Sequence, residues 1–86
     1  MPDKMTVLEE AAAVTSGPRR EKYGHPRENF TKIATIWSVI LGIPVTPEQV
    51  APCMIGTKIA RETNVPDRDN IVDIAGYARN IEMLNE

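Results

Sequence analysis

The chain has 86 residues, a mass of 9.6 kDa, a formal net charge of −2 and a single cysteine. This length supports one domain rather than two. The lone Cys53 excludes an internal disulfide framework, and one cysteine with one histidine excludes a zinc site. The longest apolar stretch, residues 33–43, is shorter than the roughly 18 residues of a membrane span. We therefore expect no membrane partner.

The first half of the chain predicts two helices. The first is expected over residues 3–16, with Asp3 as its N-cap. Gly24 and the residue before Pro26 must then break the helical path, and residues 19–23 are expected to form at most a short turn of helix. The second helix is expected over residues 26–41, and its apolar positions recur at helical spacing. This predicted buried stripe is Phe30, Ile33, Ala34, Trp37, Ile40 and Leu41.

The second half predicts two further helices. A capping box beginning at Thr46 predicts a helix over residues 47–63, although Pro52 in its interior removes one backbone hydrogen bond. After a short loop, an aspartate at 67 or 69 is expected to cap a helix over residues 68–84. No segment alternates apolar and polar residues as a strand does, so the fold class is all-α.

The predicted architecture is a compact bundle of about four helices in a single domain, residues 1–86. Val50, Met54 and Ile59 are expected in its core, and Cys53 beside Met54 is read as a core residue. The core is thin because only 5% of the residues are aromatic. A domain of this size buries only about 60–65% of its unfolded surface. We therefore expect either a monomer of marginal stability or a homo-oligomer that shares a core.

The last predicted helix has a polar face beside its apolar stripe. Asp69, Asp73, Tyr77 and Asn80 share this face at helical spacing. Gly76 lies in the helix interior, where glycine costs about 1 kcal/mol relative to alanine. It therefore indicates the close approach of a neighbouring helix or of a ligand, although a solvated face with a packing glycine is an equally good interpretation.

The preceding helix carries Lys58 and Arg61 on one side. Because a short loop joins the last two helices, they should be antiparallel neighbours, and these cations should face Asp69 and Asp73. One interpretation is an interhelical salt-bridge network. The other is a polar pocket in which the cations hold phosphate and the carboxylates hold a metal ion or ribose hydroxyls.

A local basic segment precedes the second helix. Residues 18–32 contain five basic and two acidic side chains. This excess is too small to predict general nucleic-acid binding, but it suits one small anionic ligand at a helix N-terminus. Tyr23 there is able to stack on a base, and Glu28 and Asn29 open the helix. The simpler interpretation is a solvated basic loop anchored by Tyr23, with His25 as a loop residue rather than a catalyst.

Three segments carry a resemblance to a known family: KYGHPRENFTKIATIW, GIPVTPEQVAPCMIGTKIAR and DNIVDIAGYA. They resemble small bacteriophage and prophage proteins that contain a domain of unknown function, with the approximate pattern YG-x-P-x-x-NF, TP-x-x-V, K-x-x-R and DN-x-x-DIAGYA. The resemblance covers roughly residues 19–80 and departs at Pro52. It implies a phage-type protein in the cytoplasm of a bacterial host, where the absence of an apolar signal region also places the chain.

The ending K-x-x-R…D-x-x-x-D-x-x-x-Y is also similar to a phage domain associated with nucleotide modification. More distantly, it is similar to the all-α nucleoside-triphosphate pyrophosphohydrolases of the MazG type, which hold magnesium with E-x-x-E and E-x-x-D motifs. This chain lacks that full set, because Thr31 follows Glu28 by three residues and the third helix presents Lys58 and Arg61 instead of carboxylates. The resemblance therefore implies a nucleotide-related ligand more than hydrolysis.

We predict a protein that binds a nucleotide or a nucleotide-derived ligand, to tune nucleotide pools or to sequester a host defence signal. No cofactor and no catalytic residue are assigned. The predicted ligand-binding residues are Arg19, Arg20, Tyr23, Asn29, Lys58, Arg61, Asp69, Asn70, Asp73 and Tyr77. One alternative is a magnesium-dependent pyrophosphohydrolase whose metal ligands are Glu28, Asp69 and Asp73. The other alternative is a protein–protein interaction module without catalysis.

Overall fold

The computed structural model describes residues 4–86, apart from the side chains of Pro18 and Arg19. The described residues form helices joined by short loops and contain no strand, which confirms the all-α fold class. The helices are α1 (Val7–Ser16), α2 (Pro18–Tyr23), α3 (Pro26–Leu41), α4 (Pro47–Asn64) and α5 (Arg68–Leu84). None of the described helices is long and apolar enough to cross a membrane.

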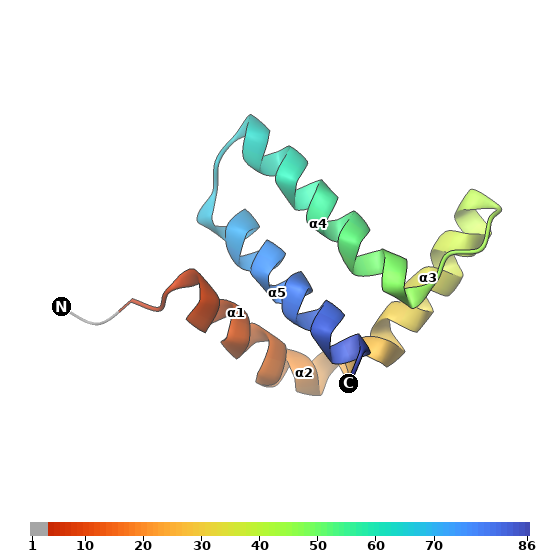
Figure 1. The fold of residues 1–86 in the computed structure, drawn as a ribbon, viewed down its shortest axis with the longest axis horizontal. Helices are drawn as coiled ribbons and strands as arrows, with labels where there is room; N and C mark the ends of the chain where they lie inside the picture. Colours follow the sequence, from red (N-terminus) through yellow and green to blue (C-terminus); the bar gives the residue numbers. More distant parts are fainter. Residues whose placement is uncertain (1–3) are drawn as a thin grey trace.

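Helix α5 is the centre of the arrangement (Figure 1). It lies between α1 on one side and α4 on the other, and α4 and α5 run in opposite directions, as the short loop between them predicts. Helix α3 crosses near the end of α5 and the start of α4, and its C-terminal turns project beyond the other helices. The hairpin of α4 and α5 therefore provides the wall against which α1 and the first turns of α3 are placed.

Local signals explain most of the helix boundaries. Helix α3 has the predicted bounds, α4 extends one residue further than predicted and continues through Pro52, and α5 begins after its N-cap Asp67. At the start of α4, the Gln49 side chain accepts a hydrogen bond of 2.8 Å from the Thr46 N–H, as a capping box requires. Gly24 has a φ of 77°, and glycine adopts positive φ without steric cost, so the helical path breaks there, before α3.

The start of the first helix was predicted too early. Asp3 lies outside the described residues, and α1 begins at Val7. Thr6 and Glu9 form a reciprocal capping box there: the Thr6 N–H donates to Glu9 Oε1 at 2.8 Å, and the Glu9 N–H donates to Thr6 Oγ1 at 3.1 Å. Two satisfied donors make this a stronger start signal than a single aspartate. Residues 19–23, predicted as a turn of helix, belong to the short helix α2.

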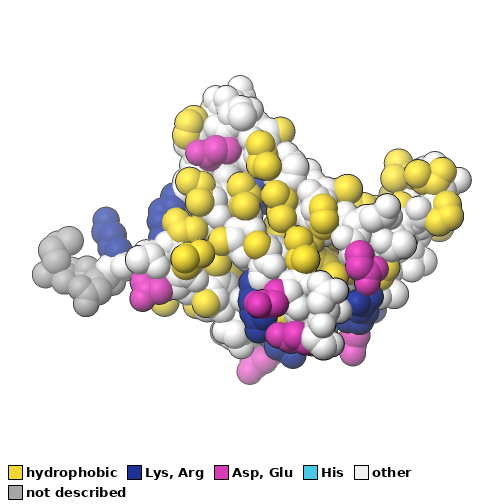
Figure 2. All heavy atoms as spheres, viewed as in Figure 1, with side chains coloured by type: hydrophobic (Ala, Val, Ile, Leu, Met, Phe, Trp, Pro, Cys, Tyr) yellow, Lys and Arg dark blue, Asp and Glu magenta, His cyan; other side chains and the backbone are white. Residues whose placement is uncertain are grey.

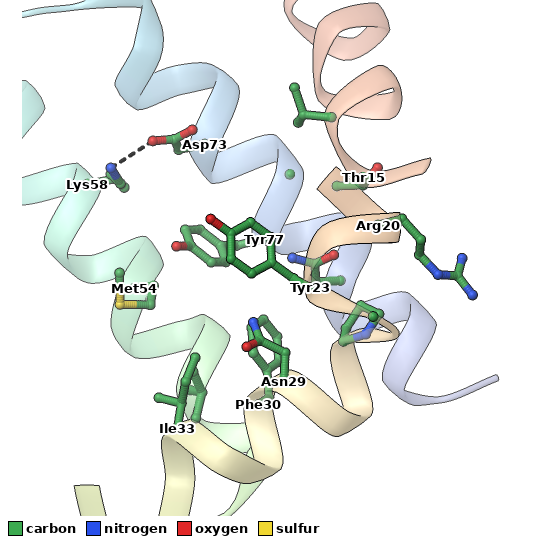
Figure 3. A pocket seen from close by; sticks show the side chains of 16 residues that line it. Thr15, Arg20, Tyr23, Asn29, Phe30, Ile33, Met54, Lys58, Asp73 and Tyr77 are labelled. Carbon is green, nitrogen blue, oxygen red and sulfur yellow. Dashed lines mark ion pairs between the residues drawn. The ribbon is translucent and has the colours of Figure 1, made fainter. Parts of the chain in front are cut away.

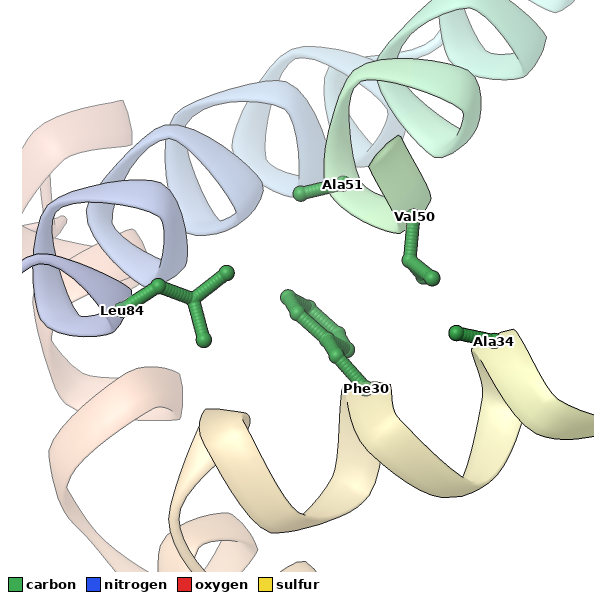
Figure 4. Packing of buried hydrophobic residues seen from close by; sticks show 5 residues of the cluster. All are labelled: Phe30, Ala34, Val50, Ala51 and Leu84. Carbon is green, nitrogen blue, oxygen red and sulfur yellow. The ribbon is translucent and has the colours of Figure 1, made fainter. Parts of the chain in front are cut away.

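The core lies where the start of α4 meets α3 and the end of α5 (Figure 4). Its buried members are Phe30, Ala34, Val50, Ala51 and Leu84. Two of these five side chains are single methyl groups, so the apolar area removed from water is small. Ala11, Val72 and Met83 are buried outside this cluster, and Phe30 is the one aromatic side chain among these buried residues.

Several side chains predicted to be buried are exposed. Ile40 and Leu41 retain 72% and 60% of their accessible surface because the last turns of α3 extend past the helices that would cover them. Ile59 is likewise exposed, and the Cys53 thiol is exposed rather than part of the core. Helical spacing identified the apolar residues correctly, but the chain contains more of them than its own helices cover.

Candidate ligand-binding site

A pocket of about 380 Å³ opens between all five described helices, α1 to α5. This volume falls within the range of small-molecule sites, about 300–1,000 Å³. Phe30 and Val50 line the pocket and also belong to the core, so the floor of the pocket is rigidly packed. The remaining wall combines aromatic, amide and charged side chains, the mixture that orients a ligand in an otherwise apolar site.

Aromatic side chains from three helices line the pocket (Figure 3). Tyr77 of α5 packs against Phe30 of α3, with ring centroids 6.4 Å apart and ring planes at 32°. Tyr23 is the last residue of α2, and Gly24 turns the chain immediately after it. The Lys22 ammonium lies 5.4 Å from the centre of the Tyr23 ring. Two tyrosines from helices far apart in the sequence therefore contribute rings to one cavity.

An ion pair forms part of the same wall. Lys58 Nζ of α4 lies 2.7 Å from Asp73 Oδ2 of α5 (Figure 3). The two side chains retain only 13% and 28% of their accessible surface, so solvent screens this pair less than a fully exposed one. The pair presents a donor and an acceptor side by side. It confirms the predicted facing of α4 and α5 for Lys58 and Asp73 alone, since Arg61 and Asp69 are exposed.

Helix α1 packs against α5 at Gly76. A Cβ placed on Gly76 would lie 3.7 Å from Thr15 Cγ2, an ordinary van der Waals contact. Gly76 also lines the pocket, together with Asn29 and Asn80. Gly76 therefore lies where the neighbouring helix α1 packs on α5, and it also lines the cavity.

The pocket contains six of the ten predicted ligand-binding residues, while three others lie elsewhere in the described structure. Those that line it are Arg20, Tyr23, Asn29, Lys58, Asp73 and Tyr77. Arg20 lines the rim, and Figure 3 shows its guanidinium directed away from the tyrosine rings. Arg61 and Asp69 are exposed and do not line the pocket. Asn70 is buried, but its amide donates a 3.2 Å hydrogen bond to Glu62, which gives it a structural role. The side chain of Arg19 lies outside the described residues.

The residues predicted for a magnesium site do not gather. Asp73 is in the pocket paired with Lys58, whereas Glu28 and Asp69 are exposed on the first turns of α3 and α5. Over residues 4–86, no group of three or more His, Cys, Asp or Glu side chains is placed to hold a metal ion.

Some pocket residues were not singled out from the sequence. Asn80 was placed on the polar face of the last helix but not assigned to the site, although it follows Tyr77 by three residues and continues that face. Met54 and Ile33 were predicted as core, and they are partly buried against it while also lining the cavity. Thr15 was placed on a face of the first helix but not assigned to the site, because its place in the pocket depends on how α1 packs on α5.

Fold and site together define a small all-helical domain with a pocket of ligand size at the junction of its five described helices. A family model described as a domain of unknown function (DUF6378) matches residues 6–84, so the chain belongs to that family. This confirms the expected relation to phage proteins of unknown function, since the relatives reported next come from bacteriophages.

The chain is 43% identical over 82 residues to the Gene 55 protein of Mycobacterium phage L5, which covers 93% of this chain and 53% of that protein. It is also 43% identical over 82 residues to the Gene 55 protein of Mycobacterium phage D29, covering 94% of this chain and 54% of that protein. The chain therefore spans about half the length of the curated relatives it matches. No solved structure matches it significantly.

Proposed function

We propose that the pocket binds a nucleotide or a nucleotide-derived ligand. One observation carries the proposal: two tyrosines, two asparagines and the Lys58–Asp73 pair, drawn from four helices, line one cavity of ligand size. A nucleotide needs a flat apolar surface for its base and hydrogen-bonding groups for its edges, and this combination offers both.

The base is assigned to the tyrosine rings. Stacking of a base on an aromatic ring contributes about 1–3 kcal/mol and tolerates any base. Tyr77 is held in place by its contact with Phe30, whereas Tyr23 belongs to the short helix α2 and is about half exposed. Tyr77 therefore acts as the fixed surface in this proposal, and Tyr23 covers the ligand from the mouth of the pocket.

The Lys58–Asp73 pair is assigned to the base edge or the ribose rather than to phosphate. Asp73 neutralises Lys58 at 2.7 Å, so the pair adds little net positive charge for a polyanion. A donor beside an acceptor instead matches the neighbouring acceptor and donor groups of a base edge. Phosphate is assigned to the rim, where Arg20 lies.

The similarity to the phage domain associated with nucleotide modification, and more distantly to the MazG type, also supports a nucleotide-related ligand. Relation to phage proteins makes the cytoplasm of an infected bacterium the proposed location, and pool tuning or capture of a defence signal the proposed roles. We further propose that the protein is a homo-oligomer, as its thin core implies.

The test is calorimetric titration of the protein with a panel of ribonucleotides and cyclic nucleotides, with and without Mg²⁺, followed by chromatography of the mixture. Saturable binding without product supports the proposal. Product formation that needs Mg²⁺ and is lost in Asp73→Asn would favour the pyrophosphohydrolase instead. Absence of binding across the panel, with an oligomer that Asp73→Ala and Tyr77→Ala disrupt, would favour the interaction module.

A further inference from the structure

We propose that the projecting end of α3 and the two residues that follow it, residues 36–43, form a two-fold interface with a second copy of this chain. We call this surface the α3 tip. It gives the proposed homo-oligomer a specific site, and it lies apart from the pocket, since none of its residues lines that cavity.

The α3 tip is the largest concentration of uncovered aliphatic side chains on any one described helix and its loop. Figure 2 shows these apolar atoms gathered over the projecting end of α3. Val39 and Ile36 retain 79% and 57% of their accessible surface. The exposed members are Ile36, Val39, Ile40, Leu41 and Ile43. The largest apolar patch on a typical monomer measures about 300–600 Å² and is often a functional site.

The patch has the shape of a helix-packing ridge. Ile36, Val39 and Ile40 are spaced i, i+3 and i+4, so they lie together on one face of α3. The core residues Phe30 and Ala34 lie on a different face of the same helix. Helix α3 is therefore apolar on two sides at its C-terminal end, and its own chain covers only one of them.

Charge favours a second copy as the occupant. No charged side chain and no histidine occurs from Ile33 to Pro47. A two-fold axis brings each residue close to its own counterpart, so any charge near the axis would meet the same charge. The α3 tip avoids this repulsion completely, and it offers no charge that would select an acidic or basic partner.

The apolar area of the α3 tip and the elongated shape of the chain also favour a second copy as the partner. At roughly 100 Å² of apolar surface for a fully exposed aliphatic side chain, the five members present about 300–400 Å². This is about half of the roughly 800 Å² per partner in a standard interface, of which little more than half is apolar. The radius of gyration is 14.0 Å. A compact chain of this length would have about 12 Å, and the projecting end of α3 contributes to the excess (Figure 1).

Sedimentation equilibrium on the full chain tests the inference. The wild type is expected to form a species of twice the 9.6 kDa chain mass. The fraction of chains in this dimer should rise with protein concentration. Val39→Glu and Ile36→Glu each place a charge beside its own copy, and each should weaken dimerisation at least about tenfold while leaving the helical circular dichroism unchanged. The matched control is Ile59→Glu, which changes an exposed isoleucine of α4 and should leave the dimer intact.

A wild type that stays at the chain mass up to millimolar concentration would overturn the inference. So would a dimer that persists in both tip variants, or one that only Ile59→Glu disrupts, because another surface would then hold it. The Val39→Glu monomer should still bind the nucleotide that the wild type binds. A variant that no longer self-associates but still binds nucleotide shows that the interface and the pocket are separate sites. The dimer proposal and the nucleotide proposal can therefore fail independently.

Discussion

Lys58 and Asp73 join the two longest described helices at the wall of the pocket, with Nζ and Oδ2 2.7 Å apart. Both side chains are largely withdrawn from water. A pair in this position holds α4 against α5 and also presents polar atoms to the cavity. The structural interpretation and the ligand-binding interpretation of these residues are therefore compatible, and they can be separated only by measuring stability and binding in the same variants.

We expect Asp73→Ala to lower the free energy of unfolding by about 1–3 kcal/mol, because it leaves the poorly exposed Lys58 ammonium without its partner. Urea unfolding followed by circular dichroism measures this change. The double variant Lys58→Met/Asp73→Leu should recover much of the loss, since no buried charge remains. It should still fail to bind nucleotide. If the double variant binds as tightly as the wild type, the pair has no role in the site.

Tyr23→Ala should weaken nucleotide binding about 5- to 100-fold, because it removes a stacking surface contributing about 1–3 kcal/mol. Tyr23 is about half exposed, so the loss of its ring should change stability little. Tyr23→Phe keeps the ring and serves as the control, with affinity expected within about threefold of the wild type. Calorimetric titration gives all three affinities. Equal affinity for all three proteins would show that the base does not stack on Tyr23.

Gly76→Ala and Gly56→Ala form a matched pair. Both glycines are inside helices, where alanine is more favourable by up to about 1 kcal/mol, and neither site has an atom closer than 3.7 Å to the added Cβ. We expect both variants to unfold at higher denaturant concentration. Only Gly76 lines the pocket, so only Gly76→Ala should weaken ligand binding. A Gly76→Ala protein that is less stable than the wild type would contradict the observed spacing between α1 and α5.

The contacts of Arg27 predict a contribution to stability that is lost in acid. Its guanidinium donates to Glu48 Oε2 at 2.7 Å and to the Leu84 carbonyl at 2.8 Å, which links the starts of α3 and α4 to the end of α5. The Arg27 hydrogen bond lowers the pKa of Glu48 below its usual value of 4.5. A carboxyl with a depressed folded-state pKa stabilises the fold above its unfolded pKa, and this stabilisation is lost as the pH falls through the folded pKa.

Unfolding by urea between pH 3 and pH 7 measures this effect. The wild type should lose stability as the pH falls below about 4.5, and Glu48→Gln should lose less over the same interval because it cannot be protonated. Since Glu48 is exposed, the difference should be small and should diminish in high salt. Parallel pH curves for the two proteins would show that the Arg27–Glu48 pair does not contribute.

Local signals in the sequence predict most of the helix boundaries. The stop at Gly42, the capping box at Thr46 and the cap at Asp67 are decided by residues within one helical turn, and the structure places helix boundaries there. The first helix was predicted too long because Asp3 was preferred to the Thr6–Glu9 box. Both are local signals, and the reciprocal pair satisfies one more backbone donor.

The pairing of Lys58 with Asp73 could also be predicted, because a short loop fixes α4 and α5 as antiparallel neighbours. Arg61 and Asp69 fit the same pattern but are exposed, since spacing alone does not reveal how the two helices are rotated about their axes. The exposure of Ile40 and Cys53 was missed for a related reason. Burial depends on which helices reach a given turn, and α3 extends past its neighbours.

The central claim is that the pocket binds a nucleotide, and the most direct measurement is a titration of the ¹⁵N-labelled protein with the same ribonucleotides and cyclic nucleotides, followed by NMR. We predict saturable amide shifts for at least one nucleotide, concentrated at Asn29, Gly76 and Tyr77 around the cavity. Residues of the α3 tip should not shift. If no nucleotide in the panel produces saturable shifts, or if the shifts spread over exposed basic side chains without involving the pocket, the claim is wrong.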